Sequence, residues 1–145
     1  MSEDKLIGHM VDSIGFKNLS EEQIEELKKP IGAKFLSTRF DGLTSIKSIA
    51  VTMRLNNVFG FGKWQIRVKD MNTRPTIQKT KKGDRDVFYS VCHVTLSVPE
   101  YGIHYECEAG SMNEEEGDSK KGAITDSITK IASWLGIGYE IYCGK

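Results

Sequence analysis

The sequence has few of the residues that build disulfide frameworks, zinc sites and membrane spans. Its 145 residues include only three cysteines, Cys92, Cys107 and Cys143, which show neither a pairing pattern nor a CxxC spacing. We therefore expect no disulfide framework, no metal site and a reducing compartment. The apolar runs are too short to cross a bilayer, and the first residues lack the layout of a signal peptide. These absences predict a cytoplasmic protein.

Motifs for nucleotide binding and for nucleophilic catalysis are also missing. No GxxxxGK[ST] loop is present to hold a nucleoside triphosphate, which argues against ATP-driven recombinases, helicases and kinases. No GxSxG motif is present either. His9, His93 and His104 stand apart in the sequence, and His93 is interpreted as a packed or surface residue of a strand. We expect no catalytic residue and no cofactor.

Charge is balanced over the whole chain but is segregated along it. The formal net charge is zero. Residues 1–27 carry two lysines against seven acids, and residues 83–145 carry five basic residues against eleven acids. Residues 28–82 carry thirteen lysines and arginines against only Asp41 and Asp70. A basic middle between acidic flanks can form a positive face on a neutral molecule, although a mixed, solvated surface is the simpler interpretation.

The spacing of apolar residues predicts two helices, three strands and a final helix. Ser20 and Gln23 have the capping-box arrangement that starts a helix, which is expected to end near Lys29 before Pro30. The second helix is expected over residues 46–59, and the glycines that follow, Gly60 and Gly62, are expected to end it. Alternation of apolar and polar residues predicts strands over residues 64–69, 87–98 and 103–109.

Two further segments complete the predicted fold. The lysine- and threonine-rich residues 70–86 are expected to connect the first two strands, with a turn at residues 81–84. The final helix is expected over residues 120–135. Its predicted apolar stripe, expected to pack on the sheet, consists of Ile124, Ile128, Ile131 and Leu135.

These elements predict an α+β fold in which a three-stranded antiparallel β-meander packs against helices, with a β-β-β-α core. The expected organisation is an N-terminal helical segment over residues 1–32, followed by the core over residues 33–145.

One strand carries a set of side chains that could support catalysis. Alternation places His104, Glu106 and Glu108 on one face of the third strand, where carboxylates and an imidazole can hold a divalent metal. Asp126 or Glu114 could complete such a site, which would make the protein a metal-dependent nuclease. The alternative is a solvated strand face whose acids balance Arg67 and Lys69 across the sheet.

The basic middle of the chain favours binding to a nucleic-acid backbone. Lysines and arginines contact phosphates, and counterion release then supplies affinity that tolerates any sequence. No base-reading helix motif accompanies them, which favours single-stranded DNA as the ligand. Nearby aromatic residues could stack on bases or belong to the core: Phe35, Phe40, Phe59, Phe61 and Trp64.

Three segments, in this order, resemble the Rad52-type single-strand annealing proteins, which include bacteriophage members. Residues 55–64, LNNVFGFGKW, are similar to the family's "helix, N-x-hydrophobic-F-G-x-x-G-W, strand" cassette. Residues 88–96, FYSVCHVTL, resemble its second strand. Residues 121–136, KGAITDSITKIASWLG, resemble its helix with the pattern K-x-A-V-T-D-x-L-K-R-A.

The resemblance implies subunits assembled into a ring or helical filament, and a positive groove that holds single-stranded DNA with its bases exposed. It implies annealing of complementary strands without ATP, in homologous recombination or double-strand break repair, in a bacterial host cell if the protein is phage-encoded. A single-strand-binding protein or an exonuclease is a possible partner. No bond-breaking activity is implied.

The resemblance also assigns individual residues. Ser37-Thr-Arg39 matches the family's serine-serine-arginine, so Arg39 is expected in the groove, and Lys130 matches the arginine of the helix's lysine–arginine pair. Thr129 stands at the lysine of that pair and Ser133 at a further arginine, which weakens the charge on this helix. The predicted DNA-binding residues are Arg39, Lys47, Arg67, Lys69, Lys79, Lys81, Lys82, Lys120, Lys121 and Lys130.

Overall fold

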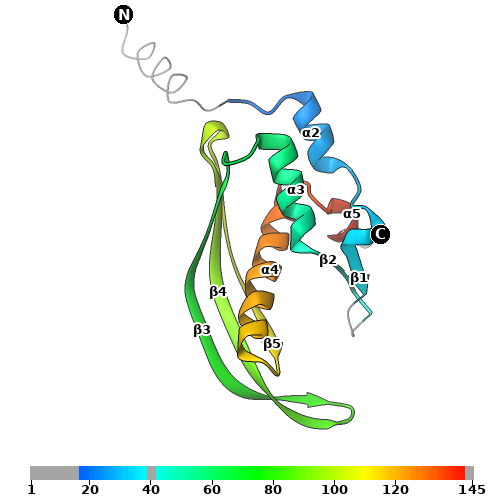
Figure 1. Cartoon of the computed structure of the whole chain (residues 1–145), viewed down its shortest axis with the longest axis vertical. Coiled ribbons are helices and arrows are strands. Elements are labelled where there is room, and N and C mark those ends of the chain that lie inside the picture. Colours follow the sequence, from blue (N-terminus) through cyan, green and yellow to red (C-terminus); the bar gives the residue numbers. More distant parts are fainter. Residues whose placement is uncertain (1–16, 39–41, 143–145) are drawn as a thin grey trace, which may run out of the picture.

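A computed structural model describes residues 17–38 and 42–142 of the chain (Figure 1). Its helices and strands run in the order α2 (Glu21–Lys28), a 3₁₀ turn (Ala33–Phe35), β1 (Leu36–Thr38), β2 (Thr44–Ile46), α3 (Ser48–Phe59), β3 (Gln65–Thr80), β4 (Gly83–Val98), a 3₁₀ turn (Pro99–Tyr101), β5 (Ile103–Asn113), α4 (Glu116–Trp134) and α5 (Tyr139–Tyr142). The predicted α+β class and the β-β-β-α order are confirmed. None of the helices in these two ranges has both the length and the apolar character needed to cross a membrane.

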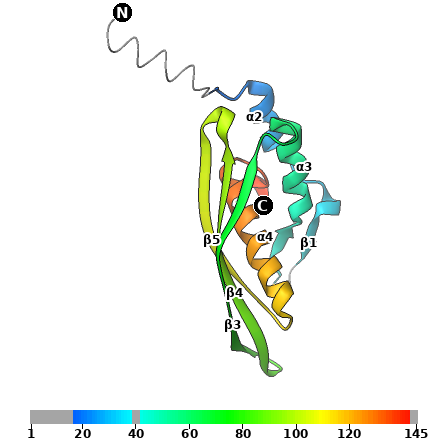
Figure 2. The same cartoon turned by 60° about the vertical axis from the view of Figure 1, so that its left-hand side comes forward.

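The main sheet is an antiparallel meander in the order β3-β4-β5. The prediction of a connecting segment over residues 70–86 is wrong, because β3 and β4 continue through it as a hairpin with a two-residue turn between Thr80 and Gly83. Strand β5 ends at Asn113, which lies opposite Phe88 of β4. The hairpin therefore projects beyond the third strand as a two-stranded ribbon, and Figures 1 and 2 both show its tip beyond the first turn of α4.

A β-bulge in β3 changes which side chains face the helix. The pairing of Lys69 with His93 is followed by that of Asn72 with Val91, so β3 carries one extra residue at this point. Asp70 takes up the bulge with a positive φ of 53°. Beyond the bulge Thr73 turns towards α4, and its hydroxyl lies 2.7 Å from that of Ser90.

Helix α4 covers one face of the sheet, mainly over β4 and β5. The predicted apolar stripe is only partly correct: Ile131 is fully buried, whereas Ile124, Ile128 and Leu135 are half-buried and pack against the core. The side chains of α4 that are fully buried against the sheet include small ones, Ser119, Ala123 and Ser127. Small residues allow the helix backbone to approach the sheet closely.

A third layer lies on the far side of α4. Figure 2 shows α4 between the sheet and α3, and α2 packs on α3 at one end of the molecule. The capping box of α2 is confirmed: the amide of Gln23 donates to Ser20 Oγ at 3.1 Å, and the amide of Ser20 donates to Gln23 Oε1 at 2.9 Å. Leu27 and Ile31 join the same hydrophobic core as the buried residues of β4 and α4.

Candidate nucleic-acid interface

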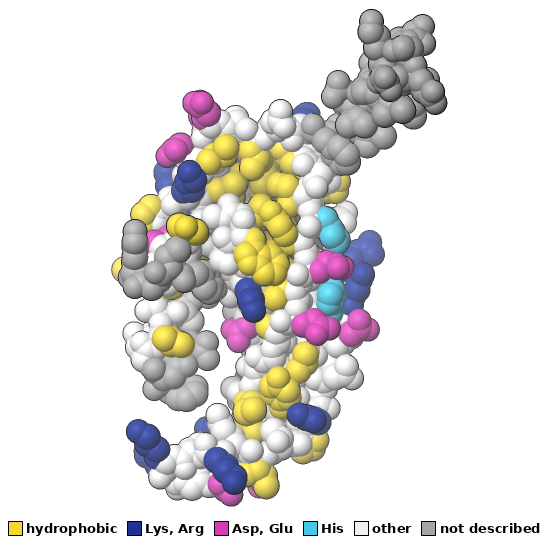
Figure 3. Space-filling view, turned by 180° about the vertical axis from the view of Figure 1, so that it is seen from behind, with side chains coloured by type: hydrophobic (Ala, Val, Ile, Leu, Met, Phe, Trp, Pro, Cys, Tyr) yellow, Lys and Arg dark blue, Asp and Glu magenta, His cyan; other side chains and the backbone are white. Residues whose placement is uncertain are grey.

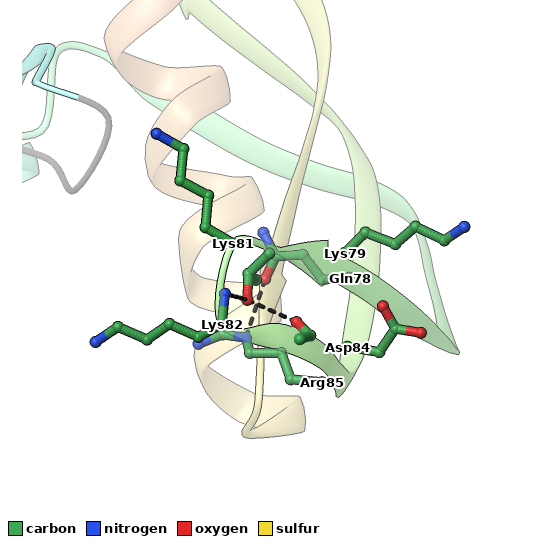
Figure 4. A pocket seen from close by; sticks show the side chains of 8 residues that line it. Gln78, Lys79, Lys81, Lys82, Asp84 and Arg85 are labelled. Carbon is green, nitrogen blue, oxygen red and sulfur yellow. Dashed lines mark hydrogen bonds between the residues drawn. The ribbon is translucent and has the colours of Figure 1, made fainter.

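The tip of the β3–β4 hairpin concentrates basic side chains on a projecting ribbon. Residues 78–85 line a hollow of about 1070 Å³. They carry four basic side chains, Lys79, Lys81, Lys82 and Arg85, against a single carboxylate, Asp84. All eight residues are exposed except Gln78, which is half-buried. Figure 4 shows the lysine side chains extending from the ribbon in different directions, with their ammonium groups apart.

Local hydrogen bonds hold the tip in shape without using the lysine ammonium groups. Thr80 Oγ1 donates to the carbonyl of Gly83 at 2.6 Å and accepts from the amide of Lys82 at 3.2 Å. Gly83 has a φ of 117°, a conformation that glycine adopts at little cost. Within the described ranges the ammonium groups of Lys79, Lys81 and Lys82 make no ion pair, which leaves them available to phosphates.

Arg85 belongs to the tip but was missed by the sequence prediction. Its Nε donates to Gln78 Oε1 at 3.0 Å, and its guanidinium lies 3.3 Å from the carboxylate of Glu114. The turn signal at residues 81–84 could have predicted the position of Arg85. A two-residue turn at this point pairs the two strands so that Arg85 lies directly opposite Gln78.

The lysines of α4 fall into two groups. Lys120 and Lys121 lie in its first turns, at the same end of the molecule as the hairpin tip (Figure 1). Lys120 is 3.4 Å from Glu116. Because three glutamates and Asp118 occupy residues 114–118, these two lysines lie in an acidic neighbourhood.

Lys130 is exposed near the other end of α4, close to β5. Burial raises the pKa of the Cys107 thiol on β5, and the Lys130 charge opposes part of that rise. At the positions where the resemblance would place basic groups, Thr129 is buried with its hydroxyl donating to the Thr125 carbonyl at 3.0 Å. Ser133 donates to the carbonyl of Lys130 at 2.5 Å, so both hydroxyls are bonded to the helix itself.

Of the remaining predicted residues, those that the structure describes are not brought together with the tip. Lys47 is exposed at the N-cap of α3, and its backbone amide donates to the Phe35 carbonyl at 2.8 Å. Arg39 lies outside the described residues. Arg67 and Lys69 are exposed on the face of the sheet opposite α4, because they alternate with Ile66 and Val68.

The aromatic residues of the basic segment divide between core and surface. Phe59 is buried and packs against Tyr101 in a tilted arrangement, with ring centroids 5.4 Å apart. Trp64 Nε1 donates to Asn56 Oδ1 at 2.8 Å, which ties the start of β3 to α3. Phe61 is 84% exposed in the turn between these elements, whereas Phe40 lies outside the described residues. Among the four of these residues that the structure describes, Phe61 therefore has the most exposed ring.

The predicted acidic face of β5 exists, and it also includes His93 of β4. Glu106 Oε1 lies 3.4 Å from His93 Nε2 and 3.6 Å from His104 Nε2. Glu108 Oε1 lies 3.7 Å from His93 Nδ1. Contact with His93, and to a smaller extent with His104, lowers the pKa of Glu106. In the part of the chain that the structure describes, no three His, Cys, Asp or Glu side chains have the geometry to hold a metal ion.

Comparison with known protein families assigns the chain to a family. Residues 20–143 match the model of the Rad52/22 family double-strand break repair protein. The match covers most of the chain, so the protein belongs to this family. No curated protein matched the sequence.

Proposed function

We propose that this protein binds single-stranded DNA through its phosphate backbone, self-associates and anneals complementary strands in recombination or repair. The family match supports a role in double-strand break repair. The observation that carries the proposal is the hairpin tip, where Lys79, Lys81 and Lys82 are exposed on a projecting ribbon and make no ion pair within the described residues, whereas Arg85 pairs with Glu114. Cations on a projecting surface attract any sequence, because every nucleotide carries the same phosphate.

Backbone-led binding suits annealing for a physical reason. Base edges must stay free to pair with a second strand, so affinity has to come from phosphates and from stacking rather than from base hydrogen bonds. The exposed tip lysines have the chemistry for the phosphate contribution. Strand pairing then supplies the free energy, and neither ATP nor a metal ion takes part in the proposed reaction.

Binding is tested by fluorescence anisotropy with labelled oligonucleotides of several sequences over a range of salt concentrations. Lys81→Ala/Lys82→Ala should weaken binding to all sequences alike. If both lysines contact phosphates, the slope of log K against log salt should become shallower by about 1.4, since single strands contribute about 0.7 per phosphate.

The matched control is Lys28→Ala/Lys63→Ala, which removes two exposed lysines from α2 and from the α3–β3 turn. These elements lie at the opposite end of the molecule from the hairpin tip (Figure 1). Equal losses of DNA affinity in the two double variants would show that only net charge matters, and the tip would then not be the binding site.

Annealing is tested with two complementary labelled strands in EDTA and without nucleotide. The proposal expects faster duplex formation than without protein, with both strands intact on a denaturing gel. Cleavage in magnesium or manganese that Glu106→Gln abolishes would instead identify a nuclease. Absence of DNA binding even at low salt would overturn the proposed function.

A further inference from the structure

Arg85 differs from the lysines of the hairpin tip because it has an acidic partner. Its guanidinium lies 3.3 Å from Glu114, in the turn that joins β5 to α4, and its Nε donates to Gln78 Oε1 at 3.0 Å. The tip lysines make no ion pair with any described residue. A guanidinium binds phosphate oxygens in a two-pronged geometry that an ammonium group lacks. The tip group best suited to a phosphate is thus already held by a carboxylate.

The contact joins two segments that strand pairing does not join. β5 ends at Asn113, opposite Phe88, so Arg85 lies on the ribbon beyond the last row that includes β5. Glu114 and the neighbouring part of the ribbon line a hollow of about 600 Å³. The side chains of Arg85 and Glu114 are 45% and 62% exposed. Water and ions therefore reach the pair, and an exposed ion pair of this kind is weak enough to exchange its partner.

The helix dipole does not explain the position of Glu114. Residues 114–118 form an acidic run of three glutamates, a glycine and an aspartate. The dipole of α4 favours the acids of its first turn. Glu114, however, precedes the N-cap residue Glu115, and its carboxylate contacts Arg85. At the lower end of the molecule, where the ribbon projects, Figure 3 shows Lys and Arg side chains with acidic side chains among them.

Arg85 also lines the tip hollow, together with the three lysines. A long arginine side chain has several rotamers, so its guanidinium can turn from Glu114 to a phosphate in this hollow without moving the ribbon. A strand held by the lysines brings further phosphates close to Arg85 and raises their local concentration there. A single free phosphate has no such advantage over the carboxylate.

We propose that Glu114 competes with DNA for Arg85. The strand contacts the free tip lysines, and one of its phosphates then displaces Glu114 from the guanidinium. Arg85 is therefore a further DNA-binding residue, and Glu114 is an internal competitor that lowers the affinity for all sequences alike. Inorganic phosphate, which does not bridge the lysines and Arg85, leaves the pair in place. This inference rests on the DNA binding in the proposed function and deepens the description of its site.

The test compares two carboxylates of the same turn by fluorescence anisotropy with a labelled single strand. Glu114→Gln should raise the affinity roughly two- to five-fold at low salt, the range expected from the loss of one exposed ion pair. Glu115→Gln is the matched control and should raise it less, because the Glu115 side chain makes no capping hydrogen bond and no ion pair with the described residues. Arg85→Gln should lower the affinity. In the Arg85→Gln background, Glu114→Gln should have no larger effect than Glu115→Gln.

A second measurement follows the pair itself. In NMR spectra of the wild type, the Arg85 Nε–H signal should move when an oligonucleotide is added, and stay in place with inorganic phosphate at the same phosphate concentration. A signal that the oligonucleotide does not move would overturn the inference, and so would a signal that moves equally with both.

Three affinity results would also overturn it while leaving the proposed function standing, provided that the wild type binds DNA and Lys81→Ala/Lys82→Ala weakens that binding. They are equal effects of Glu114→Gln and Glu115→Gln, an effect of Glu114→Gln that persists in full without Arg85, and an Arg85→Gln protein with wild-type affinity. Circular dichroism checks that every variant is folded. A wild type that binds no DNA at low salt would overturn the inference and the proposed function together.

Discussion

The guanidinium of Arg54 in α3 donates a hydrogen bond of 2.8 Å to the backbone carbonyl of Lys29, just past the end of α2. The same Nη1 lies 2.9 Å from the Glu26 carbonyl and 3.1 Å from the Leu27 carbonyl. The last carbonyls of a helix have no partner within it, and a cation there also opposes the negative end of the helix dipole. One arginine of the basic segment thus closes α2 and is unavailable to phosphates.

Replacing Arg54 should therefore cost stability rather than DNA contacts. Arg54→Met keeps much of the aliphatic stem but removes every donor, and we expect it to lower the free energy of unfolding by about 2 kcal/mol. Urea denaturation followed by circular dichroism measures this change. Met53→Ala, at an exposed neighbouring position, is the control and should change stability by less. An Arg54→Met protein as stable as the wild type would mean that water replaces these hydrogen bonds.

The two glycines of α4 should respond in opposite directions to alanine. A Cβ at Gly122 would lie 2.9 Å from Ser111 Cβ on β5, closer than packed atoms tolerate, so the helix would have to move away from the sheet. We expect overpacking of about 1–3 kcal/mol to outweigh the gain of about 1 kcal/mol in helix propensity. Gly122→Ala should therefore lower the melting temperature.

Gly117 is the matched control in the same helix. A Cβ there meets nothing within 4 Å, so Gly117→Ala should leave stability unchanged or raise it by up to about 1 kcal/mol. Thermal unfolding of both variants under one condition provides the comparison. A Gly122→Ala protein that melts at or above the temperature of the Gly117→Ala protein would show that α4 can move without cost.

Local patterns in the sequence predicted most of the fold. The capping box at Ser20 and the alternation in β4 depend on neighbouring residues, and both are confirmed. The hairpin arms were missed because residues 70–86 are exposed on both faces over much of their length, and so lack apolar alternation. The helix stripe was only partly right because the close approach at Gly122 depends on tertiary packing with β5.

The candidate site was less predictable than the fold. The turn at Lys81 and Lys82 was identifiable from the adjacent glycine and aspartate, and the structure places both lysines at the tip. A count of charges cannot distinguish those lysines from Arg54, whose guanidinium donates to backbone carbonyls at the end of α2. It also cannot distinguish them from Arg67, which lies on the face of the sheet opposite α4. All of them are basic residues of one segment, and only tertiary structure gives them different surroundings.

The buried cysteines should make stability depend on alkaline pH. Burial raises the pKa of the Cys92 and Cys107 thiols, so the folded protein holds these protons more tightly than the unfolded chain. Their contribution is fully present below the ordinary thiol pKa of about 8.5 and is lost as pH rises through the folded values. The free energy of unfolding of a Cys143→Ser protein should therefore fall faster above about pH 9 than that of the same protein with Cys92→Ala and Cys107→Ala.

Iodoacetamide should label neither Cys92 nor Cys107 in the folded Cys143→Ser protein at pH 8, and it should label both in urea. Rapid native labelling would mean that the α4–sheet interface opens readily.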